Sequence, residues 1–231
     1  GQEMSNPLTL TMDAPKTLTA ILGTVPSEVV EAWGSNGFGL CTDPSPSSGF
    51  VALSAGYSHS LGLKSDGSIV AWGSNDYGQC DVPLPNSGFV AIAAGGGHSL
   101  GLKSDGSIVA WGDNYYGQCN VPSFNCDFVA ISAGGRHSLG LKSDGSIVAW
   151  GSNDVGRCNV PVPNGDFVAI AAGNVHSLGL KSDGSIVAWG CQVPSPNSDF
   201  VAVSVGGNHS LGLKSDGSIV AWGSNDYGEC D

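Results

Sequence analysis

The fifteen residues His98–Gly112, HSLGLKSDGSIVAWG, occur five times in this chain without a single change. The other copies begin at His59, His137, His176 and His209, so the unit recurs every 39 residues, with a last step of 33. A nearly identical unit of about 40 residues is typical of repeat architectures. The repeat therefore decides the fold, and residues that recur in every copy are better explained as scaffold than as a binding site.

Each unit has the pattern of an antiparallel meander. Phe89–Ala94 is an apolar run of strand length, His98–Ser104 alternates between apolar and polar residues, and Ser107–Gly112 returns as a third strand. The Asp-Gly pair at 105–106 predicts a two-residue type I′ hairpin, which needs positive φ at both central positions. Pro122 marks the end or edge of a possible short fourth strand. We therefore expect three to four antiparallel strands per unit.

Strands that are apolar on both faces must be covered on both sides, and neighbouring sheets can provide that cover. Four-stranded sheets arranged radially form a β-propeller of about 4–8 blades. A β-solenoid is the competing architecture, but it rarely places a two-residue hairpin in every coil. The sequence therefore predicts an all-β β-propeller with six Trp-Gly units visible, which gives six or seven blades once the ring is closed.

The predicted propeller covers residues 26–231, with units that start near residues 50, 89, 128, 167 and 200. Residues 1–25 contain two strand-like runs, Pro7–Met12 and Thr17–Leu22, that predict a hairpin. This hairpin is either a degenerate first blade or the end of a preceding β-rich domain, and the second reading is slightly favoured. Before Cys191 the six residues equivalent to Ser74–Gln79 are missing. This loss of one loop after Trp-Gly predicts a notch on the face that carries these loops.

The charge balance argues against two classes of partner. The chain has 20 acidic and 8 basic residues and a net charge of −12. Nucleic acid and negatively charged membrane surfaces would be repelled. No apolar run approaches the roughly 20 residues of a membrane span, so no membrane insertion is expected. Residue 1 is not Met and no signal peptide is present, which predicts a processed product or a piece of a longer chain.

No catalytic, metal or cofactor site is predicted. Equivalent histidines on different blades cannot converge on one zinc ion, so we expect each to bond the backbone of the adjacent turn. The repeated tryptophans are predicted to pack between blades, and the repeated cysteines to be reduced and packed, because ring geometry keeps equivalent sulfurs apart. These scaffold positions are His59, His98, His137, His176, His209, Trp33, Trp72, Trp111, Trp150, Trp189, Trp222, Cys41, Cys80, Cys119, Cys158, Cys191 and Cys230, and Cys126 stands outside the pattern.

The differences between copies point to a binding surface. Two positions before each histidine vary, as do two positions in the loop after each Trp-Gly, and all five tyrosines of the chain lie in these two sets. Tyrosine on a rigid turn offers a large contact area at low entropic cost. The candidates for partner binding are Tyr57, Ser58, Tyr77, Tyr115, Tyr116, Arg136, Asn174, Asn208 and Tyr227.

The pattern A-G-x-x-H-S-L-G-L-K-S-D-G-S-I-V-A-W-G-x-N-x-x-G-Q-C-x-V-P resembles the repeat of the regulator of chromosome condensation family. It is most similar to the bacterial branch, which includes β-lactamase inhibitory protein II. The resemblance implies a propeller, most often seven-bladed, with a protein-binding surface and no catalytic residues. This chain departs from the family in having five complete units, and Tyr57 is the one aromatic residue before the histidines, which argues against tight β-lactamase inhibition.

These observations predict a non-catalytic protein-interaction propeller from a bacterial secreted or surface protein. The alternative is a structural unit that self-assembles into homo-oligomers through the open edge of an incomplete ring. A small-GTPase exchange factor is a third possibility that rests on fold analogy alone.

Overall fold

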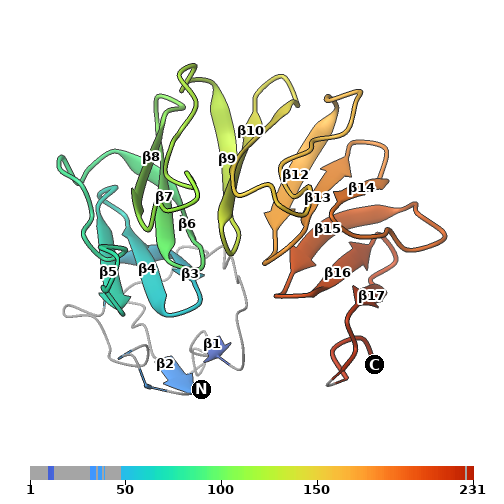
Figure 1. Ribbon diagram of the computed structural model, residues 1–231, viewed down its shortest axis with the longest axis horizontal. Coiled ribbons are helices and arrows are strands. Elements are labelled where there is room, and N and C mark those ends of the chain that lie inside the picture. The colour runs from blue at the N-terminus through green and yellow to red at the C-terminus, as the bar shows by residue number, and fades with distance from the viewer. Residues whose placement is uncertain (1–9, 13–31, 35, 38, 40–47, 227) are drawn as a thin grey trace, which may run out of the picture.

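The computed structural model describes residues 10–12, 32–34, 36–37, 39, 48–226 and 228–231. Within them, five three-stranded antiparallel sheets follow one another along the chain, and Figure 1 shows them side by side around an arc. The all-β propeller class is confirmed, with three strands in each sheet. The sheets are β3 (Phe50–Ala55), β4 (His59–Lys64), β5 (Ile69–Gly73); β6 (Phe89–Ala94), β7 (His98–Lys103), β8 (Ile108–Gly112); β9 (Phe128–Ala133), β10 (His137–Lys142), β11 (Ile147–Gly151); β12 (Phe167–Ala172), β13 (Ser177–Lys181), β14 (Ile186–Trp189); β15 (Phe200–Val205), β16 (His209–Lys214), β17 (Ile219–Gly223).

Two further short strands lie at the opening of the arc (Figure 1). β1 (Leu10–Met12) pairs in parallel with β2 (Ala32–Gly34), which is the end of the sixth Trp-Gly copy. Thr17–Leu22, the second strand of the predicted N-terminal hairpin, lies outside the described residues.

The Asp-Gly turn forms a hairpin of a different type from the predicted one. Gly106 has a φ of 80°, and it is the one residue of the pair with a positive φ. Its N–H donates to the carbonyl of Lys103, while the Lys103 N–H donates to the carbonyl of Ser107. This is a three-residue loop closed by a left-handed glycine, rather than a two-residue type I′ turn. The Asp105 carboxylate fixes it by accepting from both the N–H (2.9 Å) and the Oγ (2.6 Å) of Ser107.

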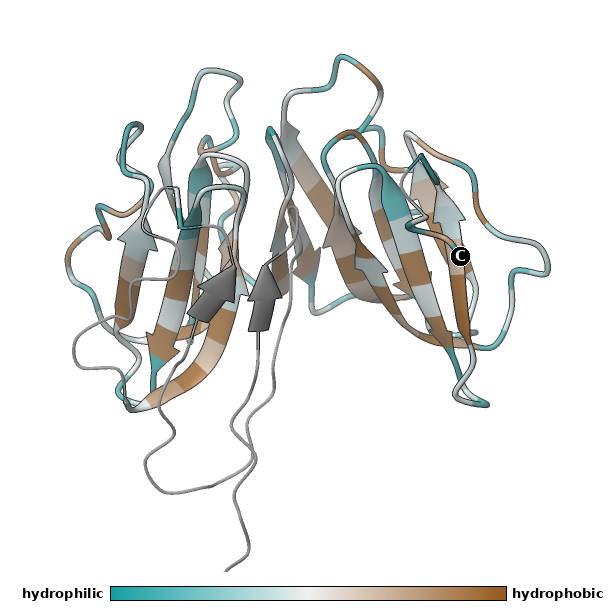
Figure 2. Cartoon of the chain, turned by 90° about the horizontal axis from the view of Figure 1, so that it is seen from below, coloured by the Kyte–Doolittle hydropathy of each residue, from teal (hydrophilic) through white to brown (hydrophobic). Residues whose placement is uncertain are grey.

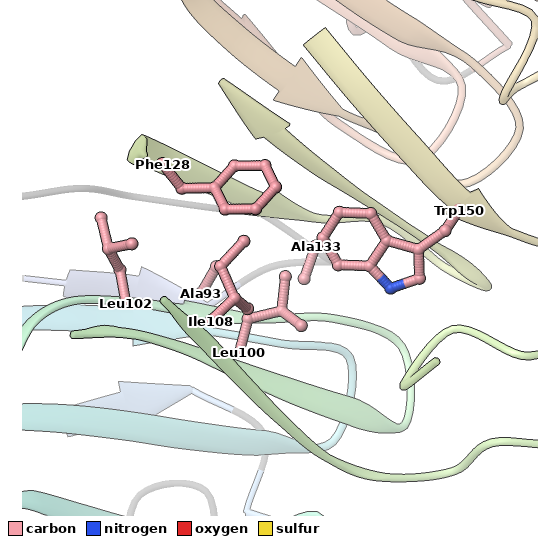
Figure 3. Packing of buried hydrophobic residues seen from close by; sticks show 7 residues of the cluster. All are labelled: Ala93, Leu100, Leu102, Ile108, Phe128, Ala133 and Trp150. Atoms are coloured by element: carbon pink, nitrogen blue, oxygen red, sulfur yellow. The ribbon is translucent and has the colours of Figure 1, made fainter. Parts of the chain in front are cut away.

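The core lies between successive sheets rather than within any one of them. Figure 3 shows one junction, where Leu100, Leu102 and Ile108 of the second sheet meet Phe128 and Trp150 of the third. All of these side chains are buried, and equivalent residues form the junctions before and after it. The predicted packing of tryptophan between blades is confirmed for Trp111, Trp150 and Trp189. In Figure 2 apolar residues band the strands and polar residues mark many of the turns at their ends.

A buried hydrogen-bond relay crosses each of the first three junctions. Nε2 of His98 lies 2.9 Å from Oγ of Ser138 in the next sheet. Ser138 donates to the backbone carbonyl of Gln118, and Nε1 of Trp150 donates to the same oxygen. Because the Ser138 proton is already donated, its oxygen must accept from His98, which places the histidine proton on Nε2. The expected partner, the backbone of the adjacent turn, is therefore wrong: the histidines His59, His98, His137 and His176 bond serines of the following sheet at 2.8–2.9 Å.

The shortened unit interrupts this relay. The carbonyl of Arg157 accepts from Ser177 and Trp189, as that of Gln118 does one junction earlier. The six residues missing before Cys191 include the equivalent of Arg157. Nε1 of Trp222 is consequently buried without an acceptor among the described residues.

A side chain takes the place expected for a fourth strand. The amide of Asn125 accepts from the N–H of Ile108 (2.7 Å) and donates to its carbonyl (2.8 Å). It therefore satisfies the outer edge of β8 as a neighbouring backbone would, and a full fourth strand is not required. Asn86, Asn164 and Asn197 do the same for the first, third and fourth sheets.

Substitution of Gly134 is expected to test how closely the sheets approach near the axis. A Cβ on Gly134 would overlap the His137 ring and the Gly173 carbonyl of the next sheet. Gly134→Ala should lower the free energy of unfolding by about 2 kcal/mol or more. Gly165→Ala is the matched control, because a Cβ there meets nothing within 4 Å. Urea denaturation of both variants checks this, and equal stabilities would contradict the packing.

The fold is expected to lose stability at pH values well above those at which carboxylates titrate. Burial lowers the pKa of His59 to about 4 and those of His98 and His137 to about 3. Unfolded histidine protonates near its ordinary pKa of about 6.5, so the unfolded state binds more protons as the pH falls. Stability should decrease by about 1.4 kcal/mol per pH unit for each of these histidines below pH 6.5.

Urea unfolding between pH 7 and pH 5 measures this slope. His137→Asn should reduce the slope of the free energy of unfolding against pH by the contribution of one histidine, about 1.4 kcal/mol per pH unit, whatever its effect on stability at pH 7. A free energy of unfolding that stays constant between pH 6.5 and pH 5 would show that these histidines are not buried in neutral form.

Candidate functional site

The sheets present two different ends to solvent. We call one end the loop face: it carries the turns before the histidines and the loops after Trp-Gly, and so every predicted binding position that the structure describes. We call the opposite end the turn face: it carries the Asp-Gly turns. The loop-face turns are residues 56–58, 95–97, 134–136, 173–175 and 206–208, and its loops are 74–79, 113–118 and 152–157.

The centre of the loop face is a shallow depression on the axis of the arc. It encloses about 460 Å³, including space open to solvent, and it is lined by the Ala-Gly ends of four inner strands and by Val205 and Gly206 at the end of the fifth. Backbone hydrogen bonds connect neighbouring turns around it, such as the N–H of Gly96 to the carbonyl of Gly134 at 3.1 Å. Tyr57 stands exposed on its rim. The depression is therefore small, rigid and mostly apolar.

The most structured group on this face lies between the second and third sheets. The rings of Tyr115 and Tyr116 meet edge to face with centroids 4.9 Å apart. The guanidinium of Arg136 lies 4.7 Å from the Tyr116 ring centre, and its Nη1 donates to the Tyr116 hydroxyl at 3.0 Å. Residues from the variable loop of the second unit and from the variable turn of the third unit thus form one cluster. We call Tyr115, Tyr116 and Arg136 the tyrosine–arginine cluster.

Internal hydrogen bonds hold the loop below this cluster. The side chain of Asn114 accepts from the N–H of Cys119 and donates to Asn120. Oε1 of the buried Gln118 accepts from the N–H of Tyr116 at 2.9 Å. Sγ of Cys119 donates to the Asp113 carbonyl at 3.2 Å. The loop is therefore a fixed platform rather than a flexible tether.

The repeated cysteines are part of these platforms. Cys80, Cys119, Cys158 and Cys230 are unpaired thiols whose Sγ donates to a backbone carbonyl six residues earlier. Burial raises the pKa of Cys119 to about 12, which keeps this thiol protonated at neutral pH. The prediction of packed cysteines is wrong for Cys191, whose side chain is exposed; Cys126, which is not one of the repeated cysteines, is exposed as well. Cys41 lies outside the described residues.

The other candidate residues are spread over the loop face. Tyr77 packs against Gly97 of the second unit, so Cδ2 of its ring would lie 3.5 Å from a Cβ placed there. Asn174 and Asn208 are exposed, and Ser58 is half-buried. The structure does not describe Tyr227. The tyrosine–arginine cluster is thus the part of the predicted set that the fold brings into direct contact.

Sequence reasoning missed Arg157. It occupies the position of Gln79 and Gln118, is 5% exposed, and donates from Nη1 to the Asn174 carbonyl at 3.1 Å. No ion pair partners it among the described residues. The signal was present in the sequence, because this position changes from glutamine to arginine between copies.

Other kinds of site find no support in the described part of the chain. No three His, Cys, Asp or Glu side chains gather there in a way that could hold a metal ion. No helix in that part is long and apolar enough to cross a membrane.

Comparison with solved structures returns propellers. The ectodomain of the receptor kinase CR4 from Physcomitrella patens is 26% identical with a TM-score of 0.65, over 76% of this chain and 50% of that one. Prp20p from Saccharomyces cerevisiae is 20% identical (TM-score 0.67, 92% and 67%), and human WBSCR16 is 20% identical (0.62, 75% and 61%). This chain thus spans half to about two thirds of each of these proteins. No curated protein matches it by sequence.

The family model for the regulator of chromosome condensation (RCC1) repeat matches five segments of the chain. They are residues 50–79, 89–118, 128–157, 167–193 and 200–229, which together make up more than half of its length. Each segment begins at the first strand of one sheet and ends in the loop after its Trp-Gly. The chain therefore belongs to the regulator of chromosome condensation (RCC1) repeat family.

Proposed function

We propose that this chain is a non-catalytic propeller that binds a protein partner through its loop face, with the tyrosine–arginine cluster at the centre of the contact. The observation that carries this proposal is the preformed contact of Tyr115, Tyr116 and Arg136 on a hydrogen-bonded loop. Tyr115 is 85% exposed, so most of its ring is available to a partner.

General properties of interfaces support a protein as the partner. Tyrosine and arginine are enriched among the residues that contribute most to protein–protein affinity. A rigid loop loses little conformational entropy when it binds, so more of the contact energy appears as affinity. The cluster also lies where the copies differ, while the scaffold around it repeats. These features are typical of loops that carry function on a constant framework.

The relatives support the partner class but not its identity. The structure report on Prp20p describes that protein's binding to Gsp1p and histones, at 20% identity to this chain. A role as a small-GTPase exchange factor would rest on the fold alone. A β-lactamase-inhibitor role has little support, since Gly, Asn and Ser dominate the positions before the histidines.

We further propose that the chain is part of a bacterial secreted or cell-surface protein. Its net charge of −12 and its similarity to the bacterial form of the repeat support this. No cofactor, metal or nucleic acid forms part of the proposal.

Substitutions copied from other repeats should weaken binding without unfolding the chain. Tyr116→Val introduces the residue at the same position of the third unit, Val155, and Arg136→Gly introduces that of the second, Gly97. A partner captured with the immobilised wild-type chain is expected to bind the double variant at least about tenfold more weakly, which corresponds to about 1.4 kcal/mol. Surface plasmon resonance with the purified partner measures the dissociation constants.

The control is Cys126→Ser on the turn face, which copies Ser87 and Ser198 of other units and should bind like wild type. The proposal fails if the double variant and the control bind the partner equally well.

The exposed face of the last sheet favours self-assembly as a second function. Ile219 is 68% exposed and Leu213 39%, whereas their equivalents in the first four sheets are 2–3% exposed. Those equivalents are each covered by the phenylalanine and tryptophan side of the next sheet. We propose that a second copy of the chain covers this face, because the same leucine and isoleucine positions are buried by sheet-on-sheet packing at all four junctions within the chain.

Light scattering over a range of concentrations tests this assembly. The wild-type chain is expected to show a dimer mass, and Ile219→Asp a monomer mass, since a carboxylate cannot be buried in that junction. The side chain is exposed in the single copy, so the substitution should not unfold it. Leu84→Ser, on the turn face, serves as the control and should remain dimeric. A monomeric wild-type chain at all concentrations would contradict the assembly.

A further inference from the structure

The turn face carries large apolar side chains that point away from the fold. They lie in the loops that lead into the second, third and fourth sheets, where Leu84 is 89%, Phe124 82% and Val162 89% exposed. We call these three residues the apolar tips. Single exposed apolar residues are common on proteins, but here they recur at three successive junctions.

The loops below the tips are fixed on the sheets. Asn125, next to Phe124, pairs through its amide with both backbone groups of Ile108. Nζ of Lys142 lies 3.4 Å from the Phe124 carbonyl and 5.0 Å from the Phe128 ring centre. In the loop before it, Lys103 donates to the carbonyls of Pro85 and Ser87. These contacts therefore hold the loops in a conformation in which the tips are exposed.

Half-exposed valines extend this apolar surface toward the axis. Each inner strand begins with buried Phe and then Val, and in all five sheets the strand register shifts at this point. The valine side chain at this position remains partly in solvent in every sheet. These residues are Val51, Val90, Val129, Val168 and Val201.

Carboxylates surround the apolar side chains. Asp127 precedes β9 and packs against the Asp105 turn, since the Phe128 N–H donates to the Gly106 carbonyl. The hydroxyl of Ser107 lowers the pKa of Asp105, so this group is ionised at neutral pH. The exposed acids of this face are Asp66, Asp105, Asp127, Asp144, Asp166, Asp183, Asp199 and Asp216. The eight aspartates outnumber the five lysines of the face, each of which lies over a phenylalanine ring, so the net charge of the face is negative.

We propose that the turn face is a second interaction surface, which binds a basic polypeptide segment that carries apolar side chains. Its apolar residues pack on the tips and valines, and its lysines or arginines face the carboxylates. Charge complementarity selects this occupant over a membrane, because the ionised turns would be pressed against lipid headgroups. The surface lies at the opposite end of the sheets from the tyrosine–arginine cluster and does not depend on the function proposed for it.

The probe is a fluorescein-labelled peptide of about 12 residues in which lysine and leucine alternate, titrated with the full chain and followed by fluorescence anisotropy. The first double variant, Leu84→Ser with Val162→Ser, introduces serine at both positions, because Ser195 holds the same position before the fifth sheet. The second double variant, Asp127→Gly with Asp166→Gly, introduces the glycine that Gly88 provides before the second sheet. Glycine adopts the φ of 63° of both aspartates without strain. Each double variant is expected to bind the peptide about tenfold or more weakly and to keep its unfolding midpoint.

Further peptides and lipid separate the outcomes. Cys126→Ser should bind the lysine–leucine peptide like wild type, a lysine–serine peptide should bind at least about tenfold more weakly, and a glutamate–leucine peptide should not bind. Equal affinity of the lysine–serine peptide would overturn the proposal, because the tips would then contribute nothing. It is also overturned if neither double variant changes binding, or if the chain binds phosphatidylcholine vesicles through the tips in preference to the peptide.

Discussion

Each sheet of this protein is apolar on both faces, and that constraint governs the rest of the structure. A sheet such as β6–β8 offers Leu100, Leu102 and Ile108 to the sheet after it and Phe89 and Trp111 to the sheet before it. No sheet can bury both faces alone, so stability is a property of junctions rather than of units. The polar relay through His98, Ser138 and Trp150 also constrains the height and angle of the next sheet, because its hydrogen bonds form only over a narrow range of distances and angles. Regular junctions then leave both ends of the sheets free to vary.

The sequence predicted the architecture well because the same pattern of strands and turns occurs in each of five copies. Strand order, the hairpin and the packing of Trp150 all follow from period, polarity and the Asp-Gly turn. What it could not specify were bonds that depend on distances between units. The serine partner of His98 lies 40 residues away, and nothing local distinguishes it from the turn backbone. The loop type at Asp105 depended on a carboxylate that captures the Ser107 amide, and Asn125 replaced a strand through its side chain.

The candidate site was predictable in part. Variation between copies identified Tyr115, Tyr116 and Arg136, but their contact depends on a loop of one unit lying above a turn of the next. The same comparison passed over Arg157, because a change from glutamine to arginine in a loop looks like drift until its burial is known. The turn face was missed for a different reason. Its apolar tips lie in a proline-rich linker, and exposure of Leu84 or Phe124 cannot be inferred from composition.

The missing acceptor above Trp222 also bears on how such an array can grow. Where neighbouring units are interchangeable, a duplicated unit can be inserted at any junction and will find the carbonyl that its serine and tryptophan require. The shortened unit is the exception, because whatever follows it inherits a buried indole N–H with no described acceptor. Exchange of units elsewhere in the array should therefore be tolerated, whereas any unit placed directly after the deletion lacks this acceptor for its indole N–H. The deletion gives an otherwise uniform array a fixed landmark.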